Sequence, residues 1–126
     1  MEMVTNAVNW CEIPVADFDR AKAFYSAIFD YDMPSQQMGP NQMGFLLFEQ
    51  GKGVGGAIVK GHGYVPSQEG VLVYLNGGSD LAIVLNRVEA AGGTVLLGKT
   101  AITPELGFFA FFLDSEGNKL ALHSMA

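Results

Sequence analysis

The chain has 126 residues, of which 49% are hydrophobic and 16% are charged. This composition excludes a disordered chain, and the length fits one domain rather than two. A formal net charge of −6 disfavours nucleic acid and anionic membrane surfaces as partners. No apolar stretch approaches the roughly 20 residues of a membrane helix, and no secretory signal is visible after Met1. Because Cys11 is the one cysteine and no internal disulfide can form, we expect a soluble, cytoplasmic protein.

The first half of the chain predicts a strand, a helix and three further strands. Asn6–Val15 has the pattern of a strand and leads into an acidic helix start at Asp17-Phe18-Asp19. The helix that follows, over Asp17–Phe29, places five mainly apolar residues on one face: Phe18, Ala21, Phe24, Tyr25 and Ile28. Strand-like runs separated by turn residues come next, at Met33–Met38, Met43–Glu49 and Val54–Lys60.

The second half repeats this order after a connector, Gly61–Gly70, that contains two further breakers, Gly63 and Pro66. A strand is predicted at Gly70–Gly78 and a helix over Leu81–Gly93. The buried face of this helix comprises Leu81, Val84, Leu85 and Val88, and Gly92-Gly93 predicts a left-handed stop. The last three strands are expected at Val95–Thr100, Phe108–Asp114 and Lys119–Ser124.

The two halves have the pattern of an internal duplication. Asp19 in the first helix start corresponds to Asp80 in the second, an offset of 61 residues. We interpret these carboxylates, with Asp17, as charges favoured at helix N-termini rather than as catalytic groups. A helix covers only one face of each sheet, so two such units leave a concavity between them, where we expect the functional site.

Two motifs have a structural interpretation. Gly51–Gly56 satisfies G-x-G-x-x-G, but a dinucleotide site needs a helix directly afterwards. Because Ala57–Lys60 is strand-like instead, we interpret the motif as a hairpin turn. Asp114–Asn118 predicts a reverse turn, with Gly117 at positive φ and the Asp114 side chain bonding back to the backbone.

The supply of nitrogen and sulfur ligands is small, since the chain offers only Cys11, His62 and His123. Cys11 follows Trp10 on an alternating strand and points to the opposite face, so we interpret it as a buried, inert thiol. The two histidines are interpreted as surface residues when taken alone. Four phenylalanines occupy both faces of one late strand, which predicts cover on both sides: Phe108, Phe109, Phe111 and Phe112.

Taken in order, these segments resemble the vicinal oxygen chelate superfamily, which includes glyoxalase I, extradiol dioxygenases, epimerases and bleomycin-type resistance proteins. The resemblance is carried by Asn9–Val15 with the following helix, by Leu81–Val95 with its Gly92-Gly93 exit, and by Phe111–Leu122. The last segment is similar to the family's closing D-P-x-G-N-x-I-E-L hairpin, with Ser115 in place of proline.

This resemblance implies an α+β fold in which two βαβββ modules, residues 6–60 and 70–124, form a curved, incompletely closed barrel. The chain, 1–126, is then one domain, similar to small glyoxalase-related members that are mostly uncharacterised. A homodimer is implied as well, because family members commonly pair through sheet edges.

In metal-dependent members of the family, ligands come from the first and last strands of each module. Here those positions read as Trp10, then Ala57 or Ile58, Val71 and Ala121, and none of these side chains can coordinate an ion. We therefore expect no metal and no other cofactor, and we disfavour a glyoxalase I activity because its principal electrophile would be missing.

The remaining concave site suits a small apolar or aromatic organic molecule with few polar anchors. The predicted binding residues are Trp10, Glu12, Val71, Val73, Phe109, Phe111, Ala121 and His123. A metal-independent lyase or isomerase that uses Glu12 and His123 as acid–base groups is the main alternative. A metal-dependent enzyme with displaced ligands, built from His62, His123 and Glu12, and a dimeric structural or regulatory module with a filled cavity also stay open.

Overall fold

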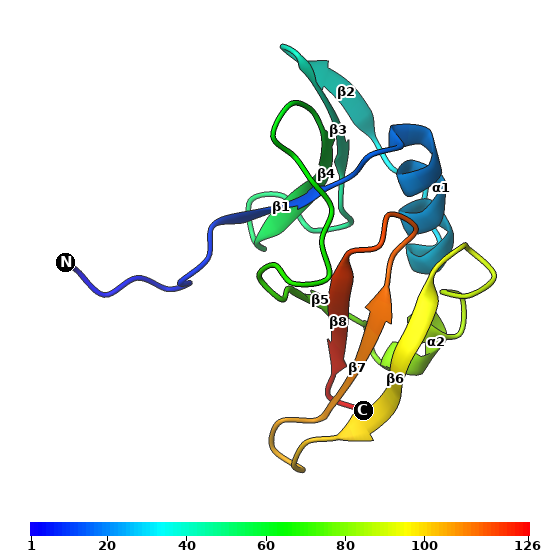
Figure 1. Cartoon of the computed structure of the whole chain (residues 1–126). Coiled ribbons are helices and arrows are strands. Elements are labelled where there is room, and N and C mark those ends of the chain that lie inside the picture. Colours follow the sequence, from blue (N-terminus) through cyan, green and yellow to red (C-terminus); the bar gives the residue numbers. More distant parts are fainter.

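The computed structural model describes all residues, 1–126, as two successive units of one strand, one helix and three strands (Figure 1). The first module comprises β1 (Trp10–Pro14), α1 (Phe18–Phe29), β2 (Ser35–Met38), β3 (Asn41–Phe45) and β4 (Gly55–Lys60). The second comprises β5 (Tyr74–Asn76), α2 (Leu81–Leu85), β6 (Thr94–Ala101), β7 (Phe108–Leu113) and β8 (Lys119–Ser124). Neither helix has the length and apolar character needed to cross a membrane.

Each module forms its own four-stranded sheet. The strand orders are β1-β4-β3-β2 and β5-β8-β7-β6, with β1 parallel to β4, β5 parallel to β8 and the other neighbours antiparallel. Both helices lie on the same side of the molecule in Figure 1. The sheets do not close into a barrel, so β1 and β5 each keep one edge free of strand pairing. This arrangement confirms the predicted α+β class with two βαβββ modules.

The two modules share one hydrophobic core. Its 18 buried residues come from both helices and both sheets, and they include the predicted helix faces, such as Phe24 on α1 and Leu85 on α2. The ring of Phe24 stacks on Phe112 of β7, with centroids 6.3 Å apart. Contacts of this kind join the modules through apolar side chains rather than through a common sheet.

A turn of the second module is also hydrogen-bonded to the first. Asp114 accepts from the backbone N–H groups of Glu116 and Asn118, both at 2.9 Å, as the sequence predicts for this turn. Its other carboxylate oxygen accepts the buried Tyr25 hydroxyl of α1 at 2.7 Å. The Asn118 amide donates to the carbonyl oxygen of Pro14 at 2.8 Å. The turn therefore connects β7 and β8 to both β1 and α1.

Several strand boundaries differ from the sequence predictions because a strand needs a partner. Trp10 pairs with Gly55, the first residue of β4, so residues 6–9 have no neighbour on the sheet. In the second module Tyr74 pairs with Ala121 in parallel register, and β8 begins only two residues earlier, at Lys119. Residues 70–71 therefore precede any partner, and the strand expected at Gly70–Gly78 is reduced to Tyr74–Asn76.

Three further elements differ in their ends. The run expected at Met43–Glu49 is β3 at Asn41–Phe45, because the hairpin turn after β2 sits directly before Asn41. The strand expected from Met33 begins two residues later. The second helix is regular only to Leu85 and continues as turns up to Gly92, which has φ of +107° and provides the predicted left-handed stop. Gly51–Gly56 leads into β4 rather than into a helix, which confirms the hairpin interpretation.

Candidate ligand-binding trough

Two adjoining pockets lie between the free edge of β1 and the segment that leads into β5. The first, called here the aromatic pocket, has a volume of about 570 Å³, and 13 of its 15 lining residues are hydrophobic. It is lined by Val8, Trp10, Cys11, Phe29, Leu46, Leu47, Phe48, Val54, Gly55, Val71, Leu72, Val73, Tyr74, Leu75 and Asn76. Pockets of 300–1,000 Å³ with mostly apolar walls are typical of small-molecule sites.

The second pocket, called here the polar pocket, has a volume of about 330 Å³. It is lined by Cys11, Glu12, Ile13, Pro14, Val65, Ser67, Gly70, Val71, Val73, Asn118, Lys119 and Leu120. Both pockets include Cys11, Val71 and Val73. The two pockets therefore adjoin, and we call them together the trough, with an apolar part at Trp10 and a more polar part at Glu12.

The trough exists because β1 has no strand on its outer side. Pro14 accepts a hydrogen bond from Asn118 across the trough, whereas Val15 donates to Val59 of the neighbouring β4 segment. The backbone groups of successive strand residues point alternately to the two edges. The N–H and C=O of Glu12 therefore face the trough, on the same edge as the C=O of Pro14, and are available to a ligand.

Trp10 and Phe48 form the aromatic wall. The rings meet edge to face at a centroid distance of 5.9 Å, and Phe45 lies 6.4 Å from Trp10. Phe48 lies over Gly55, where an added β-carbon would clash with the ring. Trp10 remains 39% exposed, so its ring is partly open to a ligand.

Glu12 lies two residues after Trp10 and therefore on the same face of β1. The Tyr64 hydroxyl, from the connector between the modules, donates to Glu12 Oε1 at 2.6 Å. The Tyr64 ring packs against a small cluster on the concave face of the first sheet, comprising Met43, Ala57 and Val59. The hydrogen bond to Glu12 raises the pKa of Tyr64, so the phenol stays protonated and donating at neutral pH.

Cys11 is half-buried and has no cysteine partner. Burial raises the pKa of its thiol, and the Glu12 carboxylate raises it further. A thiol of raised pKa is a poor nucleophile because little thiolate forms at neutral pH. The raised pKa agrees with the interpretation of Cys11 as an inert thiol, but the residue is only partly buried and lines both pockets.

The other predicted binding residues lie on the concave face of the second sheet. Phe111 pairs with Ala121, and Phe109 pairs with His123. The Phe109 and Phe111 rings are 5.2 Å apart, and Tyr74 contacts Phe111 edge to face at 6.4 Å. None of Phe109, Phe111, Ala121 and His123 lines the trough.

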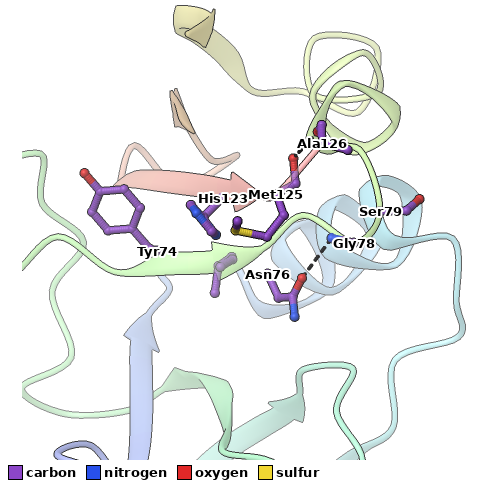
Figure 2. A pocket seen from close by; sticks show the side chains of 9 residues that line it. Tyr74, Asn76, Gly78, Ser79, His123, Met125 and Ala126 are labelled. Atoms are coloured by element: carbon purple, nitrogen blue, oxygen red, sulfur yellow. Dashed lines mark hydrogen bonds between the residues drawn. The ribbon is translucent and has the colours of Figure 1, made fainter. Parts of the chain in front are cut away.

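His123 instead lines a third pocket of about 640 Å³, beside the C-terminus, with Tyr74, Asn76 and Met125 among its other walls (Figure 2). Its Nε2 lies 2.6 Å from the carbonyl oxygen of Leu106. Glu12 lines the polar pocket and not this third pocket, so no single pocket is lined by both groups. The geometry does not bring Glu12 and His123 together for a joint acid–base step.

The two valines have different positions from those expected of cavity-facing strand residues. Val71 lies on the rim of the trough and is 92% exposed. Val73 packs in part against the shared core, on the same side as Leu75, and also lines both pockets. Tyr74 and Asn76 face the concave side, opposite Ala121 and His123. The residues of this segment that face the concave side are thus Tyr74 and Asn76, one position away from the alternation expected for Val71 and Val73.

Sequence reasoning missed most residues of the apolar wall, among them Phe48, and it missed Tyr64, which holds Glu12. Phe48 follows the end of β3 and returns over β4, and its sequence signal is Gly55, which leaves room for the ring. Tyr64 lies in a connector rich in glycine, where no periodicity marks an inward residue. Its contact with Glu12 spans 52 positions in the sequence.

The fold and the sequence together define the class of protein. The chain belongs to the Glyoxalase/Bleomycin resistance protein/Dioxygenase superfamily, whose family model matches residues 7–122. No curated protein matches the chain.

Solved structures share the fold at low sequence identity. TnmS3, an antibiotic binding protein from Streptomyces sp. CB03234, is 23% identical with a TM-score of 0.68, over 99% of this chain and 100% of that one. A glyoxylase/bleomycin resistance protein/dioxygenase domain from Frankia sp. EAN1pec is 15% identical with a TM-score of 0.70, over 96% and 98% of the two chains. A glyoxalase I mutant from Zea mays is 17% identical with a TM-score of 0.70, over 92% of this chain and 46% of that one.

The residues at the family's ligand positions do not fit a metal ion. Ala57 faces the concave side opposite Glu12, whereas Ile58 lies in the shared core, so Ala57 occupies the inward position on β4. With Trp10, Val71 and Ala121, it provides no oxygen, nitrogen or sulfur ligand of the kind that metals require. No group of three or more His, Cys, Asp or Glu side chains converges elsewhere.

Proposed function

We propose that the protein binds a small, planar, apolar or aromatic organic molecule in the trough, without a metal ion. The observation that carries this proposal is the aromatic pocket. Its walls include Phe48 and the partly exposed Trp10, and 13 of its 15 lining residues are hydrophobic. The same fold in TnmS3, which is described as an antibiotic binding protein, supports a binding role.

The physical basis is burial of apolar area against preformed rings. Each Å² of apolar surface removed from water contributes about 25 cal/mol. Favourable aromatic pairing adds roughly 0.5–1.5 kcal/mol to this. Because Trp10 is already held by Phe45 and Phe48, a ligand ring would not have to order it, which lowers the entropic cost of binding.

The test uses Trp10 as the reporter, since the chain contains one tryptophan. A screen of planar aromatic metabolites and antibiotics should find compounds that quench its fluorescence saturably. Trp10→Ala should abolish the binding of those compounds by calorimetry. Because Trp10 is 39% exposed, the free energy of unfolding should fall by less than the roughly 3–5 kcal/mol of a fully buried tryptophan.

The matched control is Leu96→Ala, which removes a similarly exposed apolar side chain, 47% exposed, from β6 outside the trough. It should leave binding unchanged. Failure of every compound to bind the parent protein would contradict the proposal. A loss of stability in Trp10→Ala as large as that of a buried tryptophan would instead identify Trp10 as a structural plug.

A further inference from the structure

We propose that Glu12, held by Tyr64, is the polar anchor of the trough and selects aromatic ligands that carry a protonated amine. This inference rests on the proposed binding function and names the class of ligand that the same site prefers. It follows from the position of the carboxylate, its hydrogen bonding and the charges around it.

The position of Glu12 suits a ligand that spans both pockets. Two residues along a strand are separated by about 7 Å, so Glu12 lies about that far from Trp10 along β1. The aromatic pocket and the polar pocket adjoin at Cys11, Val71 and Val73, which line both. A fused ring seated against Trp10 would thus place a short substituent near the Glu12 carboxylate.

The carboxylate is ordered before a ligand arrives. Tyr64 donates to Oε1 at 2.6 Å, and the structure shows no protein donor to Oε2. The Tyr64 ring is itself held by Met43, Ala57 and Val59. One oxygen is therefore fixed by the protein while the other is left for a donor on the ligand, which is the arrangement that a charge-assisted hydrogen bond requires.

The Glu12 carboxylate has no salt-bridge partner in the protein. Glu12 and Lys119 are the charged residues that line the polar pocket. The Lys119 ammonium lies 4.6 Å from the centroid of the Phe111 ring and forms no salt bridge with Glu12. The Glu12 charge is therefore not neutralised by a close partner.

The experiment compares three anthracenes that share one ring system: 9-(aminomethyl)anthracene, 9-anthracenemethanol and 9-anthracenecarboxylate. Binding to the full chain is followed at pH 7 by quenching of Trp10. The amine should bind about tenfold more tightly than the alcohol, as expected of a hydrogen bond to a charged group. The carboxylate should bind more weakly than the alcohol, because Glu12 repels it.

Three variants separate the anchor from the general charge of the protein. Glu12→Gln should make the amine and the alcohol bind equally, without weakening the alcohol. Tyr64→Phe keeps the charge but frees Glu12, so it should reduce the ratio of amine to alcohol affinity only in part. Glu69→Gln removes one charge from an exposed position of the connector outside the trough and should leave the ratio as in the parent.

The outcomes distinguish this inference from the function on which it rests. If the amine and the alcohol bind the parent protein equally, the assignment of Glu12 as an anchor for amines is wrong, but the proposed binding function stands. An equal loss of preference in Glu69→Gln and Glu12→Gln also overturns the anchor, since net charge alone would explain the preference. An unchanged ratio in Tyr64→Phe overturns the positioning role of Tyr64. If none of the three anthracenes binds, both proposals fail.

Discussion

Gly55 shows how the absence of one side chain shapes the trough. The Phe48 ring occupies the space where a β-carbon would be, and this brings the ring against Trp10. Glycine inside a strand normally weakens it and marks a close approach. Here the close approach is that of the ring which forms one wall of the aromatic pocket.

Replacing Gly55 with alanine should therefore displace Phe48 and weaken ligand binding. The expected loss is up to about tenfold in affinity, since an aromatic contact contributes roughly 0.5–1.5 kcal/mol. The Trp10 emission should also shift to the red relative to the parent, as its ring becomes more exposed to water. Titration of a ligand from the fluorescence screen, with emission spectra of the free protein, provides the measurement.

The control for this change is Gly53→Ala in the same loop, where the nearest atom to an added β-carbon is the Glu49 carbonyl oxygen at 3.6 Å. That is ordinary contact, so binding and emission should match the parent. An unshifted emission maximum in Gly55→Ala would show that Phe48 does not shield Trp10 as described.

At the scale of elements, the N-terminus of α1 is stabilised by a residue of the other module. Glu116 accepts from the backbone N–H groups of Ala16 and Asp17, at 2.9 and 2.7 Å, and from the Arg20 guanidinium at 2.7 Å. Its side chain is fully covered. Burial raises the pKa of Glu116, but these hydrogen bonds outweigh burial and the net pKa is lowered.

The lowered pKa gives Glu116 a pH-dependent contribution to stability. This contribution is fully present above the ordinary carboxyl value of 4.5 and is lost as the pH falls through the lower pKa of the folded state. Glu116→Gln should reduce the free energy of unfolding by about 1.5–3 kcal/mol at pH 7. The difference between parent and variant should shrink below pH 4.5, as measured by urea denaturation across pH.

Glu89→Gln is the matched control, because Glu89 is exposed in the second module and forms no salt bridge. It should follow the parent at every pH. If the stability difference between the parent and the Glu116→Gln variant stays constant down to about pH 3, the charge of Glu116 does not contribute.

The elements also show what the sequence could and could not predict. The faces of both helices are confirmed because burial of an apolar stripe is a local property of spacing, as at Phe24 and Leu85. The strand ends were less predictable, because a strand lasts only while a neighbour pairs with it. Trp10 and Tyr74 begin their strands where β4 and β8 provide partners, and no local pattern encodes that register.

At the scale of the whole molecule, the shared core argues against independent modules. Its residues interleave across the module boundary, with Phe24 of α1 against Phe112 of β7. The Tyr25 hydroxyl and Asp114 form a buried hydrogen bond across the same boundary. We propose that both modules unfold as one domain.

Leu122→Ala tests this proposal, since Leu122 is fully buried in the second module. Loss of its side chain should cost about 2–5 kcal/mol. The unfolding midpoint reported by Trp10, in the first module, should fall together with the midpoint from circular dichroism. A Trp10 midpoint that stays at the parent value while the other moves would show two separately folding units.

The trough was only partly predictable from the sequence, because part of it depends on contacts between segments that are far apart in the chain. Trp10 and Glu12 both line the trough and share one face of β1, which the alternation of a strand makes visible in the sequence. The position of Tyr64 beside Glu12 depends on the path of a long connector. The separation of His123 from Glu12 depends on how the two sheets are placed relative to each other. Neither is a property of a local pattern.

Residues 70–72, which precede β5 and belong to no strand, have a consequence for how the ligand preference of the protein can evolve. One wall of the trough is β1, which is tied to the core, but the other includes Val71, which is 92% exposed and outside any strand. Substitutions at such positions usually alter stability by only about 0.5 kcal/mol. New ligand preferences can therefore arise there by drift without loss of the fold, and residues 70–72 are the place to randomise in a library designed to retarget binding.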